Sequence, residues 1–349
     1  MREYYREYEL TSSQSEAVAL LESFFQSEVA CFLLKGYAGT GKTFLIRGLV
    51  NYLQARNIPV VLSAPTGRAA RVLAGKSGFR ATTIHRFLYS GELLRDVDEW
   101  QGGQYDMFKV IYGTTSNAFP ANAVFIADEA SLISDAYADN DTLKFGTGHL
   151  LNDFVRYVFP ARTANARKIL FVGDPAQLPP VEMNFSPALD AEYLKKELGL
   201  ESMSAELTGV VRQQAGSLIL QHATALRQAL ADDRFNALAL PAGLQQVVHV
   251  NSYSLVDEYL SCAGEAFEDA LVIAHSNARV HVYNQSVRSR LFPGVPEPQP
   301  GDRLVVMSNN YLHGREILNG EMGTIVEINN HALHRHTVNI RRPKQTGAD

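Results

Sequence analysis

The stretch "GYAGTGKT", residues 36–43, decides the fold. It matches the pattern G-x-x-x-x-G-K-[ST] and stands between an apolar run and a segment whose apolar residues have helical spacing. Glycines let backbone N–H groups close around phosphates, at a helix N-terminus that favours anions. In such a site Lys42 reaches the β- and γ-phosphates and Thr43 binds Mg²⁺. The predicted nucleotide-binding residues of this loop are Gly36, Gly39, Thr40, Gly41, Lys42 and Thr43.

Short apolar runs alternate with amphipathic segments over most of the first 200 residues. Their near-continuous apolar character is typical of strands in a parallel sheet that is covered on both faces. Such alternation predicts an α/β doubly wound domain, here a P-loop NTPase domain over residues 1–205. The predicted strands are 30–36, 58–64, 123–128 and 168–174, and the clearest helix is 42–57.

Other segments depart from this alternation. Glycine-rich turn signals around a strand-like "MFKVIYG" predict an inserted β-hairpin at about 88–121. From residue 206 a second α/β segment is expected to run to 349, and short strand-like pieces from about 296 predict part of a small β-barrel. The elements expected in this second segment are helices at 216–230 and 277–292, a strand at 270–276, and a proline-rich linker at 293–302.

The sequence "VFIADEAS", residues 124–131, supplies a second part of the nucleotide site. Asp128 stands at the end of an apolar strand, where it is predicted to bind Mg²⁺. Glu129 beside it can act as the general base that deprotonates the attacking water. The alternative is an ordinary pair of solvated acids at a strand end.

Gln177 lies in "VGDPAQLPP", residues 172–180, directly after the strand predicted at 168–174. That strand is expected to lie beside the strand of Asp128, so the loop emerges at the same edge of the sheet. A neutral amide there can hydrogen-bond the γ-phosphate and the water without neutralising the metal charge. We interpret Gln177 as a catalytic phosphate sensor in a proline-stiffened loop. The alternative is a stiff turn with a surface glutamine.

Composition describes an ordinary soluble globular protein. The chain of 349 residues has 32 Lys and Arg against 37 Asp and Glu, a net charge of −5, which neither suggests nor excludes nucleic acid. Two cysteines cannot form a disulfide framework or a zinc site, the charged N-terminal stretch is no signal peptide, and no apolar run could cross a bilayer. These features predict a cytoplasmic location.

The order of the motifs resembles superfamily 1 DNA helicases, and most closely the RecD/Dda-like branch. The resemblance covers about Leu10 to about Glu327 and implies two RecA-like domains, hydrolysis of ATP with Mg²⁺, and 5′ to 3′ movement on single-stranded DNA in repair or recombination. A monomer is the favoured state. The matching pieces are "GYAGTGKT", "SAPTGRAA", "TTIHRFL", "IADEASLIS", "VGDPAQLPP" and "VVRQ".

The resemblance assigns roles to further residues. Gln14 is similar to the glutamine that reads adenine, although by itself it is more typical of a helix surface. Arg212 matches the arginine that the family points at the γ-phosphate from its second RecA-like domain, where a positive charge stabilises phosphoryl transfer. Both assignments rest on the family rather than on local pattern.

The family's DNA-facing segments also have counterparts. Pro65 and Thr66 match the loop that holds the DNA backbone, and His85 and Phe87 match a second segment in which an aromatic ring can stack on bases. Phe87 could equally be a core aromatic. The insertion at 88–121 resembles the family's strand-separating wedge, and the alternative is a plain surface hairpin.

The chain departs from the family at its end. The family follows its barrel with a segment like T-x-H-K-x-Q-G, whereas this chain stops at "RRPKQTGAD", residues 341–349. We therefore expect a fragment of a longer helicase whose second RecA-like domain is incomplete. The main alternative is a module that binds ATP and single-stranded DNA with little turnover. A small-molecule kinase would share the P-loop, but the DNA-facing segments argue against it.

Overall fold

A computed structural model describes the chain except residues 7–8, 97–108, 140–142, 161–165, 210–217, 233, 235–246, 265–266, 268, 307–320, 332–334 and 342–349. The chain divides into two compact units, Met1–Gln213 and Gln214–Asp349. The last strand of the first sheet ends at Leu207, so residues 206 and 207, which we expected to open the second segment, belong to that sheet. Among the described residues, no helix is both long and apolar enough to cross a membrane.

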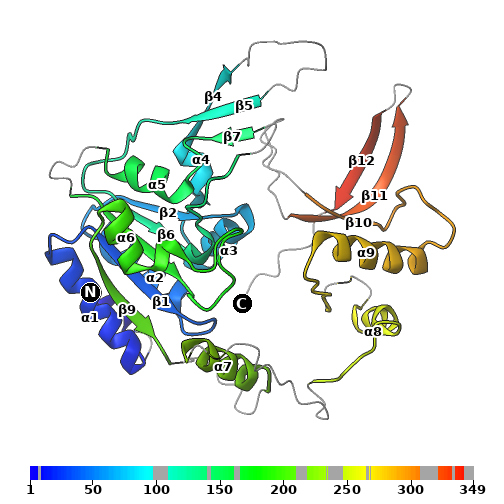
Figure 1. Ribbon diagram of the computed structural model, residues 1–349, viewed down its shortest axis with the longest axis horizontal. Coiled ribbons are helices and arrows are strands. Elements are labelled where there is room, and N and C mark those ends of the chain that lie inside the picture. The colour runs from blue at the N-terminus through cyan, green and yellow to red at the C-terminus, as the bar shows by residue number, and fades with distance from the viewer. Residues whose placement is uncertain are drawn as a thin grey trace. The chain divides into compact units, whose positions relative to one another are not determined.

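A six-stranded sheet forms the centre of the first unit (Figure 1), in the order β3-β2-β6-β8-β1-β9. Every neighbouring pair is parallel. The four strands predicted from apolar runs are confirmed, with ends that differ by at most two residues from the expected ones. The strands are β1 Cys31–Gly36, β2 Val60–Ala64, β3 Ala81–Thr83, β6 Val124–Ala127, β8 Lys168–Gly173 and β9 Ser202–Leu207.

Helices cover both faces of this sheet because successive side chains along each strand point to opposite faces. Phe32 and Leu34 of β1 pack with α1, α2 and α3, whereas Cys31 and Leu33 pack with α4, α5 and α6. The predicted α/β doubly wound architecture of a RecA-like domain is thereby confirmed. The helices are α1 Ser12–Gln26, α2 Lys42–Gln54, α3 Gly67–Ser77, α4 Ile84–Leu88, α5 Leu150–Val158 and α6 Ala191–Leu198, with short 3₁₀ turns at Arg2–Tyr5, Ala130–Leu132 and Pro187–Leu189.

A separate three-stranded sheet follows α4. Strand β4 (Tyr89–Asp96) pairs antiparallel with β5 (Lys109–Thr114), as the predicted hairpin requires. The sequence did not predict β7 (Leu143–Phe145), which adds to β5 in parallel from a segment beyond β6. The insertion is therefore a small sheet built from two parts of the chain.

A buried carboxylate ties this small sheet to α5. Asp153 is 2% exposed and accepts hydrogen bonds from the Tyr89 hydroxyl at 2.9 Å, the Thr147 backbone N–H at 2.9 Å and the Thr147 hydroxyl at 2.8 Å. Burial, followed by the Asp153 charge, raises the pKa of Tyr89, so its hydroxyl stays protonated as the donor. The carboxylate gains the several partners that a buried charge needs.

Replacing Asp153 with alanine is expected to lower the free energy of unfolding by about 2–4 kcal/mol, because buried donors on Tyr89 and Thr147 lose their acceptor. Urea denaturation would measure the loss. Asp139→Ala is the control, since Asp139 accepts an exposed hydrogen bond from Tyr137, and a change under about 0.5 kcal/mol is expected there. Equal stability of the two variants would contradict the anchoring role of Asp153.

Within its described residues, the second unit contains three helices and an antiparallel sheet. Its helices are α7 Leu218–Ala231, α8 Leu255–Cys262 and α9 Asn277–Leu291, and its strands are β10 Arg303–Val305, β11 Met322–His331 and β12 Arg335–Arg341, in the order β10-β11-β12. The helices predicted at 216–230 and 277–292 are confirmed. Because the described strands of this unit form only this antiparallel sheet, the second RecA-like domain and its barrel insertion stay predictions.

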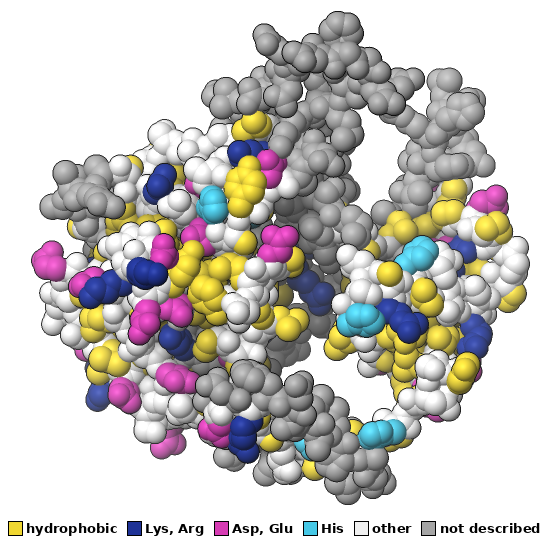
Figure 2. Space-filling view, in the orientation of Figure 1, with side chains coloured by type: hydrophobic (Ala, Val, Ile, Leu, Met, Phe, Trp, Pro, Cys, Tyr) yellow, Lys and Arg dark blue, Asp and Glu magenta, His cyan; other side chains and the backbone are white. Residues whose placement is uncertain are grey.

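The strand predicted at 270–276 is wrong. These residues form no regular element, and Leu271 and Ile273 are 82% and 87% exposed. Hydrophobic side chains accordingly lie at the surface of this unit (Figure 2). An isolated apolar run cannot form a strand without a hydrogen-bonding neighbour, and none pairs with it within the described residues.

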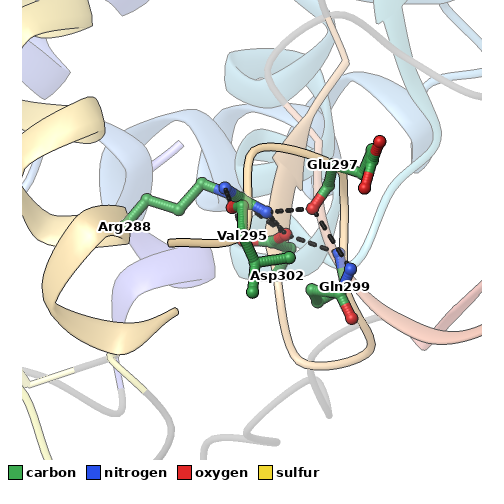
Figure 3. Close-up of polar contacts among 5 residues, drawn as sticks. All are labelled: Arg288, Val295, Glu297, Gln299 and Asp302. Atoms are coloured by element: carbon green, nitrogen blue, oxygen red, sulfur yellow. Dashed lines mark hydrogen bonds and ion pairs between the residues drawn. The ribbon is translucent and has the colours of Figure 1, made fainter. Parts of the chain in front are cut away.

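Arg288 and Asp302 hold the linker after α9 in place (Figure 3). The Arg288 guanidinium donates to both carboxylate oxygens of Asp302, at 3.0–3.2 Å, and to the carbonyls of Val295 and Glu297. The Gln299 backbone N–H also donates to Asp302, at 2.8 Å. These bonds fix residues 293–302, the predicted proline-rich linker, as a folded loop against α9.

Candidate functional site

The predicted site residues lie along one edge of the six-stranded sheet. Because all six strands are parallel, their carboxyl ends share an edge, which is where ligands bind in open α/β sheets. The loops that leave this edge, in spatial order, carry His85 and Phe87 after β3, Pro65 and Thr66 after β2, Asp128 and Glu129 after β6, Gln177 after β8, and Lys42 and Thr43 after β1. Motifs far apart in the sequence thus converge.

The loop between β1 and α2 has the geometry of a phosphate-binding loop. Gly39 and Gly41 have φ of 84° and 90°, a left-handed conformation that side chains other than glycine rarely adopt. Lys42, at the start of α2, extends its ammonium group back over the loop, where it donates to the carbonyls of Gly36 at 2.7 Å and Tyr37 at 2.9 Å. The loop therefore holds its lysine at the position where backbone N–H groups and the helix N-terminus favour an anion.

Gln14 braces this loop from α1. Its side chain is 3% exposed, so the helix-surface alternative is wrong. Its amide N–H donates to the Thr40 carbonyl at 2.9 Å, and its amide oxygen accepts from the Thr11 backbone N–H at 3.0 Å in a capping box. Both ends of the amide are bonded within the protein, and adenine recognition by Gln14 stays a prediction.

Asp128 is buried rather than solvated. It is 8% exposed, and its Oδ1 accepts a hydrogen bond from the Glu129 backbone N–H at 3.0 Å. Burial, followed by the Glu129 charge, raises the pKa of Asp128 to about 6, while the Glu129 N–H bond, Lys42 and Lys76 oppose the rise. Since burial leads this shift, the picture of two solvated acids fails for Asp128. A divalent cation would offset the cost of keeping this carboxylate ionised.

Glu129 follows with an unusual backbone. Its φ of 52° lies in the left-handed region, which is uncommon for residues other than glycine and is frequent at functional sites. The side chain is half-buried next to Asp128. The turn thus sets two carboxylates side by side in different surroundings, a buried one and a more accessible one.

The donor set fits Mg²⁺ held together with a nucleotide. Within the described residues no three His, Cys, Asp or Glu side chains cluster as a metal site made of protein alone requires. Mg²⁺ in nucleotide sites is instead bound by one or two protein oxygens, phosphate oxygens and waters. The Asp128 carboxylate and the Thr43 hydroxyl, at the first turn of α2, are hard oxygen ligands of this kind.

Replacing Asp128 with asparagine is expected to stabilise the protein in EDTA at pH 8. Because the pKa rises from 3.8 unfolded to about 6 folded, the folded state binds more protons between these values, so stability falls as pH rises through that window. Above it, the variant should gain about 1–3 kcal/mol in urea denaturation, with a smaller gain at pH 4.5. A variant less stable than the natural protein at pH 8 would show that ionised Asp128 carries no such cost.

The loop of Gln177 is shaped by the residue that opens it. The Asp174 side chain accepts a hydrogen bond from the Ala176 N–H at 3.0 Å, and its carbonyl accepts from the Gln177 N–H at 3.1 Å. Strand β8 pairs with β6 in parallel, so the predicted adjacency of the Gln177 and Asp128 loops is confirmed. Gln177 itself is exposed and can turn toward a ligand at this edge.

Ser131 and Gly173 connect the two loops and were not predicted from the sequence. Ser131 is fully buried, and its hydroxyl donates to the Gln177 amide oxygen at 3.5 Å, the long end of the range for a hydrogen bond. A Cβ at Gly173 would lie 3.1 Å from the Ser131 backbone nitrogen, so glycine is what allows this close approach. The sequence signal was the serine of "DEAS", since residues just after neighbouring parallel strands can meet.

Pro65 and Thr66, the residues between β2 and α3 that were predicted to hold DNA, are at least partly accessible to solvent. Thr66 is exposed and caps α3, with its hydroxyl oxygen accepting from the Ala69 N–H at 3.2 Å. Pro65 precedes it and is half-buried. The Thr66 hydroxyl keeps its own hydrogen for a phosphate acceptor.

His85 and Phe87 differ in their surroundings. The His85 ring is half-buried, with its centroid 5.1 Å from Phe145 of β7, and burial lowers its pKa so that the neutral form is favoured. Phe87 packs its ring against Phe125, Phe154 and Tyr157, with centroids 5.6–6.2 Å apart. The structure favours the core-aromatic interpretation of Phe87. Arg212, predicted to face the γ-phosphate, lies outside the described residues.

These observations define a class. A P-loop after the first strand of a parallel sheet, with a buried carboxylate at the end of β6 and a glutamine loop at the end of β8 between them, is the arrangement of a RecA-like P-loop NTPase.

Comparison with known proteins agrees with this class. Residues 9–142 match the AAA domain family. The chain is 26% identical over 301 residues to the ATP-dependent RecD2 DNA helicase of Deinococcus radiodurans, covering 84% of this chain and 36% of that protein. It is 29% identical over 189 residues to the uncharacterized protein R530 of Acanthamoeba polyphaga mimivirus, covering 49% of this chain and 33% of the relative. It thus spans about a third of the length of these curated relatives.

Among solved structures, the chain can be superposed on unliganded Pif1 from a Bacteroides species. That superposition has a TM-score of 0.41 and 17% identity, and it covers 95% of this chain and 72% of that one. The similarity to the RecD2 helicase agrees with the resemblance to RecD-like helicases seen in the order of the motifs.

Proposed function

We propose that this chain is the motor portion of an ATP-dependent DNA helicase, which couples ATP hydrolysis to 5′ to 3′ movement on single-stranded DNA. The observation that supports it best is the row of loops at the carboxyl edge of the sheet. There the nucleotide motifs after β1, β6 and β8 continue directly into the loops after β2 and β3 that resemble DNA-binding segments. The RecD2 relative is itself described as an ATP-dependent DNA helicase.

At the nucleotide end of this row, each side chain has a distinct task. The P-loop N–H groups and Lys42 bind the phosphates, while Thr43 and Asp128 hold Mg²⁺, which when bound neutralises charge on the phosphates. Glu129 accepts the proton of the attacking water. Gln177 hydrogen-bonds the γ-phosphate region, and Arg212 stabilises the charge that develops there.

Loss of the γ-phosphate would be transmitted through the neighbouring loops. Gln177 sits on a loop fixed by Asp174, and Ser131 links it to the turn that carries Asp128 and Glu129. A change at Gln177 would therefore move this loop as a unit. Next along the edge, the Thr66 loop would hold and release the DNA backbone in step with the nucleotide. We propose that the motor acts as a monomer and that the β4-β5-β7 sheet is its strand-separating wedge.

The second candidate is a module that binds ATP and single-stranded DNA with little turnover. It is favoured by the described strands of the second unit, which form only an antiparallel sheet rather than a second RecA-like sheet. The number of ATP molecules hydrolysed per chain in the presence of single-stranded DNA separates the two candidates. A motor hydrolyses many ATP molecules per chain, whereas the module binds ATP and hydrolyses little of it.

Direction of movement tests the proposed function. Oligonucleotides carrying streptavidin on a biotin at either the 3′ or the 5′ end would be mixed with the protein and ATP. A 5′ to 3′ motor displaces streptavidin from the 3′ end faster than from the 5′ end, and loses this activity with a non-hydrolysable ATP analogue. Faster displacement from the 5′ end would contradict the direction. Hydrolysis of ATP without displacement of streptavidin from either end would contradict movement along the DNA.

A further inference from the structure

The charge of this chain is distributed very unevenly. Residues 29–91 contain nine of the 32 Lys and Arg residues and none of the 37 Asp and Glu residues. The remaining residues carry 23 Lys and Arg against 37 Asp and Glu, so the rest of the chain is strongly acidic. In the view of Figure 2, by contrast, acidic and basic side chains are interspersed over the first unit. Residues 29–91 are therefore a basic stretch of sequence within an acidic chain.

Helix α3 (Gly67–Ser77) presents this charge outward. Its buried positions are Gly67, Ala70, Leu73 and Ser77, which lie on one side at helical spacing. Arg68, Arg71 and Lys76 are exposed on the opposite side, and the exposed Arg80 follows just beyond the helix. We call Arg68, Lys76 and Arg80 the basic strip.

The position of Arg68 argues against a purely structural role. It lies in the first turn of α3, where the helix dipole favours acids and disfavours cations by about 0.3–1 kcal/mol. That turn has no acidic residue. Helix α2, which packs beside α3, has no acidic residue either, and the carboxylate whose charge interacts with Lys76 is the buried Asp128. A cation placed where the helix opposes it is better explained by an anionic ligand than by stability.

The strip adjoins the proposed DNA loop. Arg68 stands two residues after Thr66, and α3 packs on β3, the strand at the edge of the sheet. From Arg68 to Lys76 the helix rises about 12 Å, a length along which more than one phosphate of a DNA strand can lie. A DNA strand that is bound at Thr66 would therefore reach Arg68 first and then Lys76 and Arg80.

We propose that the basic strip binds the phosphate backbone of single-stranded DNA that continues beyond the Thr66 loop, along the outer face of α3. This inference rests on the proposed function and extends the DNA path beyond the Thr66 loop. The contact is sequence-independent, because phosphates carry no base information. It also explains how an acidic protein holds DNA, since a local basic surface suffices.

The test compares two triple variants of the full chain. Arg68→Ala/Lys76→Ala/Arg80→Ala removes the strip, and Arg156→Ala/Lys195→Ala/Lys196→Ala removes three exposed cations from α5 and α6. The ion pairs of Lys195 and Lys196 are exposed, so their loss changes stability little. Fluorescence anisotropy would follow binding to fluorescein-labelled dT oligonucleotides of 8 and 30 nucleotides, and to a 30-base-pair duplex, between 50 and 200 mM salt. Thermal unfolding would confirm that each variant folds.

With the 30-nucleotide strand, the strip variant should bind at least tenfold more weakly at 100 mM salt. The slope of log affinity against log salt should fall by about 2, from three contacts at about 0.7 each. The 8-nucleotide strand is long enough to cover both the Thr66 loop and the strip, so it should lose affinity as well, and the control variant should match the natural chain. Equal losses in both triple variants would overturn the proposal, and a loss confined to duplex DNA would overturn its single-stranded assignment.

Thr66→Ala separates this inference from the proposed function. It should weaken both oligonucleotides, because it removes the contact that both share. If Thr66→Ala has no effect while the strip variant still weakens the long strand, the strip stands and the proposed role of the Thr66 loop fails. If DNA stimulates ATP hydrolysis but the strip variant binds normally, the motor stands and the strip fails.

Discussion

Replacing Lys42 with alanine is expected to lower DNA-stimulated ATP hydrolysis by at least about a hundredfold. Its ammonium group is held over the P-loop by the carbonyls of Gly36 and Tyr37, where the phosphates would displace it onto their own oxygens. A fixed cation at that point stabilises the charge that develops during phosphoryl transfer, and removing one such donor costs about 10²–10³ in rate. Steady-state hydrolysis with saturating single-stranded DNA would measure the loss.

Lys195→Ala is the control for this variant. Lys195 is an exposed lysine on α6 whose ion pair with Glu201 lies at the surface, so hydrolysis should stay within twofold of the natural chain. Thermal unfolding would establish whether Lys42→Ala stays folded, as the interpretation of its lost hydrolysis requires. Hydrolysis that survives Lys42→Ala would mean that the turnover comes from another site or another protein.

Replacing Glu129 with glutamine is expected to lower hydrolysis by about 10²–10⁴, the usual contribution of a general base, while nucleotide binding is retained. The amide keeps the size of the side chain but cannot accept the proton of water at neutral pH. Loss of the Glu129 charge also removes one cause of the raised pKa of Asp128, so Asp128 should ionise more readily and Mg²⁺ binding should not weaken. Hydrolysis and binding of a fluorescent ATP analogue, measured in parallel, would show this separation.

Glu182→Gln is a matched control for Glu129→Gln. Glu182 also has a left-handed backbone, with φ of 67°, and it is an exposed glutamate in the loop after β8. The same chemical change there should leave hydrolysis within twofold. If both variants hydrolyse ATP equally well, Glu129 is not the base. If Glu129→Gln loses nucleotide binding as strongly as hydrolysis, its role lies in the site's structure instead.

The parts of the fold that could be predicted are those determined by strong local patterns. Strands β1, β2, β6 and β8 are central, buried on both faces, and therefore continuously apolar in sequence. The P-loop and the acids of "DEAS" could be placed because they follow such strands directly. Once the strands were known to be parallel, their shared carboxyl edge brought these motifs together without any further information.

The parts that could not be predicted depend on tertiary partners. The edge strands β3 and β9 are short or half-exposed, so they lack a continuous apolar run. Strand β7 has only three residues and pairs with β5, which lies about thirty residues earlier in the chain. The residues 270–276 have the apolar pattern of a strand but no neighbour to pair with among the described residues. A pattern predicts what a segment can form, and the neighbours decide whether it does.

Side-chain roles show the same dependence. Gln14 stands at the third position of a helix, and only the fold brings its amide to the Thr40 carbonyl. Phe87 could equally stack on bases or pack in a core, and three aromatic rings from α5 and β6 favour packing. Spacing in the sequence does not contain these long-range contacts, so both residues required the structure.

The most direct test of the account is ATP hydrolysis by this chain with and without single-stranded DNA, with Lys42→Ala as the blank. Strong stimulation by DNA that disappears in the variant is expected, because the nucleotide loops and the loops proposed to bind DNA share one sheet edge. Nucleotide binding without stimulated hydrolysis would contradict a coupled motor in this chain.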